Sequence, residues 1–188
     1  MKIIVAMLLT LSLIGVVSGG GLAMLSKWAD PLIAANKKAD TERAIFLVQP
    51  SAKGYETVAE VKYELYRVFD EAKVPIGYAL PWEGNGFQGK IRMMIGLSVD
   101  LNTIIAIEVL EQVETPGLGT KVTEDPFRNQ FKGLKAVLQV DWIKNVPPTK
   151  ENEIQTITGA TISSKALVAI VNDGLARMRK DIAPGGVK

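Results

Sequence analysis

The first 26 residues are almost entirely apolar, and this pattern predicts a helix that crosses a membrane. No charged residue lies within residues 3–26, and Ile, Leu, Val and Met dominate residues 3–17. At about 1.5 Å of rise per residue, such a helix spans a hydrocarbon core roughly 30 Å thick. A cleaved signal peptide is the alternative, because Lys2 supplies a minimal positive region and residues 18–21 are small. The uncharged stretch continues to residue 26, which favours an uncleaved anchor at residues 1–26.

The pattern after the anchor predicts a helical connector and then a set of strands. Residues 27–54 form the expected connector, with Pro31 near its start and Pro50 ending its helix. Apolar and polar residues alternate in several later segments, as in half-buried strands. These segments are residues 61–66, 91–99 and 105–110, with a further apolar run at 75–80. Turns at residues 70–73 and 100–102 separate them, so an antiparallel sheet is expected.

Helical patterns flank the expected sheet. Asp125 and Pro126 are typical of an N-cap and first helical position, and they predict a short helix through Phe131. Apolar residues at helical spacing predict a final helix from Ile162 that ends in basic residues, which suit the negative end of the helix dipole. The expected fold class is α+β: one transmembrane helix, then a single domain at residues 55–188 with an antiparallel sheet and flanking helices.

Composition narrows the possible chemistry. The 188 residues include 22 Lys or Arg, 20 Asp or Glu, and neither His nor Cys. This balance argues against a nucleic-acid partner. The missing side chains exclude cysteine-ligated zinc or iron–sulfur sites, haem held by His, disulfides, and Cys-His or Ser-His-Asp nucleophiles. Any redox or catalytic chemistry would therefore use an organic cofactor, carboxylates, Lys or hydroxyls.

Two segments have compositions that folding alone explains poorly. Residues 114–119, Glu-Thr-Pro-Gly-Leu-Gly, follow an expected strand, and their glycines allow close approach of another body. A plain turn leaving the sheet is the alternative. Residues 158–164, Thr-Gly-Ala-Thr-Ile-Ser-Ser, precede the final helix, where unpaired N–H groups and the helix dipole attract phosphate. Ordinary capping by one of these hydroxyls is the alternative there.

Both segments resemble motifs of a known family. Thr158 to Thr161 resembles the attachment sequence of covalent-FMN proteins, and residues 114–119 look like the companion loop of their FMN-binding domain. With the anchor and the Gly-Asn-Gly-Phe-Gln-Gly segment at residues 84–89, the order resembles the G subunit of Rnf ion-translocating electron-transport complexes. It is also similar to the C subunit of sodium-pumping NADH:quinone reductases. The resemblance covers roughly residues 63–178.

The resemblance implies a specific flavin site. A flavin transferase would join FMN through its phosphate to the Thr161 hydroxyl, within the attachment segment. The companion loop would lie close to the flavin. The implied cofactor-binding residues are Thr158, Gly159, Ala160, Thr161, Ser163, Ser164, Glu114, Thr115, Gly117, Leu118 and Gly119. Family members often carry Asp six residues before the modified Thr, whereas this chain has Gln155, with Glu153 and Glu151 out of register.

The resemblance also implies a role and a location. The chain would carry electrons inside a membrane complex that couples ferredoxin and NAD chemistry to sodium or proton movement, and would not be an enzyme alone. The other subunits would be its partners. Positive charges after the anchor would place the domain in the cytoplasm, but the family places it on the extracytoplasmic side. Two alternatives remain open: a tethered module that binds a phosphate-bearing ligand non-covalently, and a structural spacer between subunits.

Overall fold

The structure is a computed structural model that describes residues 1–182, and its chain separates into two units, residues 1–40 and 41–188. Its helices are α1 (Lys2–Val48), α2 (Asp125–Arg128) and α3 (Thr161–Ile182), with 3-10 turns η1 (Gly119–Thr123) and η2 (Asn129–Phe131). Its strands are β1 (Gly54–Thr57), β2 (Tyr66–Phe69), β3 (Pro75–Asn85), β4 (Lys90–Ser98), β5 (Thr103–Gln112), β6 (Leu134–Lys135), β7 (Asp141–Ile143) and β8 (Glu153–Gln155).

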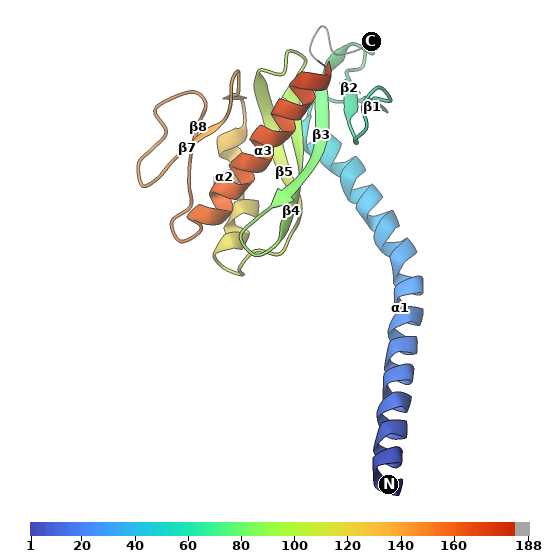
Figure 1. Cartoon of the computed structure of the whole chain (residues 1–188). Helices are drawn as coiled ribbons and strands as arrows, with labels where there is room; N and C mark the ends of the chain where they lie inside the picture. The colour runs from blue at the N-terminus through green and yellow to red at the C-terminus, as the bar shows by residue number, and fades with distance from the viewer. Residues whose placement is uncertain (183–188) are drawn as a thin grey trace. The chain divides into compact units, whose positions relative to one another are not determined.

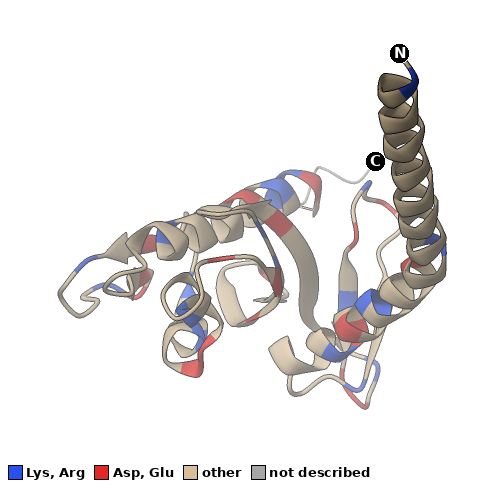
Figure 2. Cartoon of the chain, turned by 90° about the horizontal axis from the view of Figure 1, so that it is seen from below, with Lys and Arg blue, Asp and Glu red and all other residues tan. Residues whose placement is uncertain are grey.

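The first unit, residues 1–40, contains most of α1, a helix that is long and apolar enough to cross a membrane. The side chains of its most apolar stretch are not buried within the protein. Residues 3–26 carry no charge, and Figure 2 accordingly shows this stretch in tan. A basic residue lies beside the N-terminus. The protein itself does not cover this apolar surface. Transfer of such a surface from water to lipid is favourable.

The second unit is built on a six-stranded antiparallel sheet in the order β1-β2-β3-β4-β5-β6. Helix α3 lies across one face of this sheet (Figure 1) and buries Leu167, Val171 and Leu175 in the larger apolar core. The end of α1 packs on the sheet through a separate cluster that contains Ile45 and Val48. The antiparallel sheet with flanking helices confirms the α+β prediction.

Two expectations about local structure were wrong. Residues 61–65 form no strand, which begins only at Tyr66. The alternation there arises because Val61 and Tyr63 pack on the core from a loop that is closed by the Val58 N–H donating to Leu65 O at 2.8 Å. The N-cap of α2 is Glu124. Asp125 is instead the first helical residue, with its carboxylate 2.6 Å from an Arg128 nitrogen.

Close packing positions α3 over β3. A Cβ at Gly174 would lie 3.1 Å from Leu80 Cδ2 and from Trp82 Cγ, and one at Gly84 would lie 2.6 Å from Ile170 Cγ1. The two glycines therefore bring the helix and the strand together at two points. The start of α3 is consequently held at the end of the sheet where the β3–β4 hairpin turns.

Candidate functional site

The three segments singled out from the sequence meet at the buried carboxylate of Glu114. Glu114 lies just after β5 and is 3% exposed. Its Oε1 accepts hydrogen bonds from the N–H groups of Phe87 at 2.8 Å and Gln88 at 3.1 Å, at the tip of the β3–β4 hairpin. Its Oε2 accepts a hydrogen bond from the Ser163 hydroxyl in the first turn of α3. The hairpin, the companion loop and the helix start are thus joined through one side chain.

Both oxygens of Glu114 are engaged inside the protein, so the carboxylate has the contacts of a loop anchor. Gln112 supports it as well, because Gln112 Oε1 accepts the Glu114 backbone N–H at 2.6 Å. Two flanking residues have no room for a side chain. A Cβ at Gly86 would overlap Glu114 Oε1, and one at Gly119 would lie 2.8 Å from Glu114 Cβ.

The companion loop turns sharply and reaches the attachment segment. Gly117 has a φ of +74°, which favours glycine, and its N–H donates to Thr120 Oγ1 at 3.0 Å. The Leu118 side chain is 48% exposed. A Cβ at Gly159, where φ is +85°, would lie 3.4 Å from Leu118 Cδ2. The structure therefore brings the two family motifs into contact.

The hydroxyls at the start of α3 divide into two groups. Ser163 and Ser164 are buried, and Ser164 Oγ accepts from Ile157 N at 3.1 Å and donates to Ala160 O at 2.9 Å. Capping-type hydrogen bonds thus explain Ser164. Thr158 and Thr161 differ, because their hydroxyls have no hydrogen-bond partner within residues 1–182, and both side chains reach solvent.

The first turn of α3 also presents unpaired donors. Its N-cap position is occupied by Ala160, whose side chain cannot accept a hydrogen bond. The N–H of Ser164 bonds to Ala160 O, whereas those of Thr161, Ile162 and Ser163 have no acceptor in the described part of the chain. Three free amides beside a free hydroxyl at the positive end of a helix of 22 residues suit an oxyanion such as phosphate.

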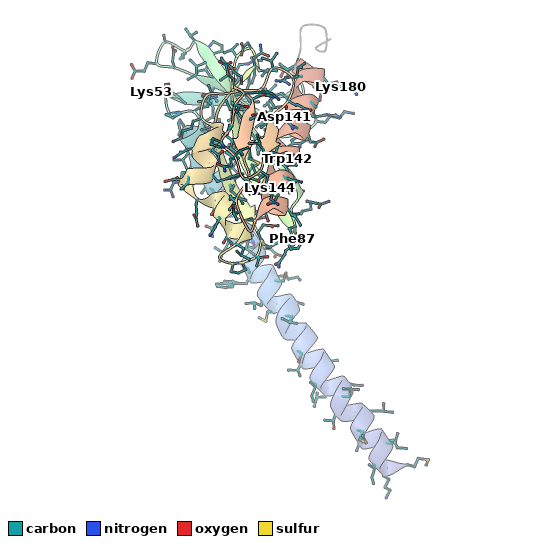
Figure 3. All side chains as sticks on the ribbon, turned by 90° about the vertical axis from the view of Figure 1, so that its left-hand side faces the viewer. Lys53, Phe87, Asp141, Trp142, Lys144 and Lys180 are labelled. Carbon is teal, nitrogen blue, oxygen red and sulfur yellow. The ribbon has the colours of Figure 1, made fainter. Side chains whose placement is uncertain are left out.

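Lys165 and Trp142 are neighbours of this turn that sequence reasoning did not pair. Lys165 lies one helical turn after Thr161, so both side chains project from the same face of α3. Its Nζ lies 3.8 Å from the centroid of the Trp142 ring on β7. Trp142 is labelled in Figure 3. A cation–π contact of this kind holds a positive charge close to the helix start. Nothing in the spacing of the two residues indicates the contact.

Gln155, where the family often carries Asp, lies on the short strand β8. Its backbone is fixed by one side chain, because Gln130 Oε1 accepts the Gln155 N–H at 2.6 Å and Gln130 Nε2 donates to Gln155 O at 3.2 Å. Glu153, two residues earlier, is buried and accepts the N–H of Thr149 at 3.0 Å. The Glu153 carboxylate is therefore committed to its own turn.

The comparisons with known proteins agree with this geometry. Residues 86–176 match the family described as the FMN-binding domain, and this range contains the hairpin tip, the companion loop and the attachment segment. The G subunit of the ion-translocating oxidoreductase complex of Methanosarcina acetivorans is 30% identical over 164 residues, which cover 81% of this chain and 84% of that protein. The chain belongs to this family of FMN-binding subunits.

Other members of the family match over shorter lengths. The G subunit of the proton-translocating ferredoxin:NAD(+) oxidoreductase complex of Clostridium ljungdahlii is 38% identical over 55% of this chain, and the chain spans 54% of that relative. The C subunit of the Na(+)-translocating NADH-quinone reductase of Vibrio alginolyticus is 30% identical over 68% of this chain and 52% of its own.

Two solved structures share the fold of this chain. The C subunit of the Na(+)-translocating NADH-quinone reductase from Parabacteroides distasonis superposes with a TM-score of 0.61 at 21% identity, over 79% of this chain and 95% of its own. NqrC of Shewanella oneidensis gives a TM-score of 0.56 at 21% identity, over 68% of this chain and 67% of its own. The antiparallel sheet flanked by helices is thus shared with these two solved structures.

Proposed function

We propose that this chain is a membrane-anchored electron-carrier subunit whose FMN is joined by a phosphoester to Thr161. The observation that carries the proposal is the Thr161 hydroxyl, which has no partner within residues 1–182, beside the uncapped amides of α3. Ser163 and Ser164 lie in the same turn, but their hydroxyls are buried and hydrogen-bonded within the protein. Thr161 is therefore the hydroxyl of the first turn that is available for modification.

The chain's own groups suit a phosphodiester at this position. The free N–H groups of residues 161–163 and the positive end of the α3 dipole would stabilise its negative charge. The Lys165 ammonium, one turn further along the same face, would add an opposite charge. Gly159 and the buried Ala160 keep the attachment segment small, so that a transferase and the flavin can approach its backbone.

The surroundings of Thr161 also suit a planar aromatic ring. Three apolar side chains from the joined segments are exposed, namely Phe87, Leu118 and Ile162. Exposed apolar side chains gathered at one site are typical of ligand-binding surfaces. FMN would supply one-electron and two-electron transfer through an isoalloxazine ring that this linkage leaves unmodified. Phe87, Leu118 and Ile162 would shield the ring from water, and the Thr115 hydroxyl would donate a hydrogen bond to it.

The proposed partners follow from the relatives. Relatives of this chain are subunits of complexes named for ferredoxin:NAD(+) or NADH-quinone chemistry and for proton or sodium translocation. We infer that other subunits of an Rnf-type complex supply and accept the electrons and move the ion, and that a flavin transferase loads the cofactor. We place the flavin domain on the extracytoplasmic side of the membrane. Protease digestion of sealed vesicles of known orientation tests this placement, and digestion of the domain only from the cytoplasmic side contradicts it.

The attachment is tested by co-expressing the full chain with a flavin transferase. Flavin fluorescence should stay with the protein band in a denaturing gel, and peptide mass spectrometry should find FMN on Thr161. Thr161→Ala should remove the modification, whereas Thr161→Ser, which keeps a hydroxyl, should retain it. Covalent flavin in the Thr161→Ala variant would refute the assignment. Flavin that copurifies with the wild-type chain but leaves it on denaturation would indicate a non-covalent site instead.

A further inference from the structure

We propose that Glu114 is the positioning residue of the flavin site, and that it sets the first turn of α3 against the tip of the β3–β4 hairpin. This inference rests on the proposed function, because it concerns the turn that carries Thr161. Glu114 acts through Ser163 and through the backbone of Phe87 and Gln88, because these groups engage both of its carboxylate oxygens.

The contacts of Glu114 link segments that are far apart in the sequence. Its two amide donors precede it by 27 and 26 residues, and its hydroxyl donor follows it by 49 residues. Ser163 is two residues after Thr161, so the hydrogen bond to Ser163 fixes the same helical turn that presents the free amides. These hydrogen bonds therefore tie the turn that carries Thr161 directly to the hairpin tip, in addition to the packing of α3 on β3.

The Glu114 carboxylate is buried and relies on hydrogen bonds from the protein. Glu114 is 3% exposed, and no salt bridge to it occurs within residues 1–182. A buried carboxylate without a cation is costly unless hydrogen bonds compensate it, and each charge-assisted bond is stronger than a neutral one. Three donors converge on Glu114, which matches this requirement. Removing the side chain would leave the three donors without their acceptor.

The adjacent glycines support the same role for Glu114. A side chain at Gly86 would overlap Oε1, and a Cβ at Gly119 would lie 3.0 Å from Ser163 Oγ and 3.1 Å from Glu114 Oε2. Neither glycine has a positive φ, so conformational freedom does not explain them. The space that they leave is the space through which Glu114 reaches the hairpin and the helix.

The role is geometric, and this makes glutamine an informative substitution. In Glu114→Gln, the amide oxygen can accept from Phe87 and Gln88 while the amide nitrogen donates to Ser163 Oγ. Both connections are therefore kept without the charge of the carboxylate. Glu114→Ala removes both connections. Ser163→Ala removes only the connection to α3. Glu56→Ala, at an exposed glutamate on β1, is the matched control.

The test combines two measurements on the full chain in detergent. Amide hydrogen exchange of the flavin-free protein reports on the Phe87 and Gln88 N–H groups, and the rate of FMN transfer by a flavin transferase reports on Thr161. We expect Glu114→Ala to lose amide protection and to slow transfer by about tenfold or more, because small misplacements of a reacting group are costly. Ser163→Ala should keep the protection but slow transfer similarly. Glu114→Gln and Glu56→Ala should match wild type in both.

The proposal is overturned if Ser163→Ala accepts FMN at the wild-type rate, or if Glu114→Gln is as slow as Glu114→Ala. Should Glu114→Ala fail to fold, the Ser163→Ala rate and a comparison of Glu114→Gln with wild type still decide the matter. The exchange measurement needs no flavin. If the wild-type chain accepts no FMN at Thr161, the proposed function fails, while the exchange data still show whether Glu114 holds the hairpin.

Discussion

Replacement of Ser164 by alanine tests how the attachment turn is built. Ser164 is completely buried, and its hydroxyl connects Ile157 N to Ala160 O across the segment that leads into α3. Alanine removes both hydrogen bonds. Ala160 O keeps a partner in the Ser164 N–H, so the main cost is the Ile157 N–H, which loses its acceptor. An unsatisfied buried donor costs about 1–3 kcal/mol.

We therefore expect Ser164→Ala to lower the free energy of unfolding by about 2 kcal/mol. In a domain of this size that corresponds to a fall in Tm of roughly 4–8 °C. Urea unfolding of the full chain in detergent, followed by circular dichroism, measures the free energy. Hydrogen exchange at the Ile157 amide measures the local effect, and this amide should lose its protection in the variant. Transfer of FMN to Thr161 should slow as well, because the turn before it is looser.

Thr158→Ala is the matched control for this experiment. Thr158 is exposed and lies in the same segment, and its hydroxyl has no partner within residues 1–182. Its removal should change stability by less than about 0.5 kcal/mol. The reasoning fails if Ser164→Ala is as stable as Thr158→Ala and its Ile157 amide remains protected.

Two further predictions concern the sheet and its pH dependence. A Cβ at Gly96 would overlap the Val48 carbonyl and lie 2.9 Å from Val48 Cβ, so Gly96→Ala should destabilise the domain by about 1–3 kcal/mol. Gly54→Ala, where a Cβ meets open space, should leave stability unchanged. Equal urea midpoints for the two variants would contradict this prediction. The Thr149 N–H, the Lys150 ammonium and other donors lower the pKa of Glu153 to about 2, so its contribution to stability is full above pH 4.5 and is lost as pH falls towards 2. An NMR titration of Glu153 with a midpoint near 4.5 would refute this second prediction. Glu153→Gln should remove the contribution of Glu153 to the pH dependence of stability between about pH 2 and pH 4.5.

The parts of the fold that follow from local pattern were predictable. The paired strands β4 and β5 and the helix α3 have regular periodicity, and residues 100–102 lie in the expected turn between those strands. Residues 61–65 show the limit of this reasoning. Their alternation is real, but it reflects apolar side chains packed from a loop, and these residues pair with no strand in the described part of the chain. Periodicity indicates which side chains are buried, and it does not indicate which backbone groups are hydrogen-bonded.

Most of the site depends on contacts that local pattern does not encode. The sequence places four hydroxyls at the start of α3 and does not separate them, because Ser163 and Thr161 are equally suited to capping. Their difference comes from Glu114, 49 residues before Ser163, which takes one hydroxyl and leaves the other free. Likewise, the contact of Lys165 with Trp142 joins β7 to α3 through tertiary packing alone.

The absence of His and Cys acquires a physical meaning at this site. The polar groups around Thr161 are amides, a lysine and a hydrogen-bonded carboxylate, and the chain has no imidazole, the side chain that ordinarily titrates near neutral pH. A flavin held there would experience fixed dipoles and a positive charge, and its reduction would draw protons from water, carboxylates, lysines or a partner. Lys165→Gln removes that charge and leaves the hydrogen bonds of Glu114 intact. It should lower the flavin potential, because the reduced, more negative ring loses a nearby cation. An unchanged potential in a redox titration would refute an electrostatic effect of the Lys165 ammonium on the ring.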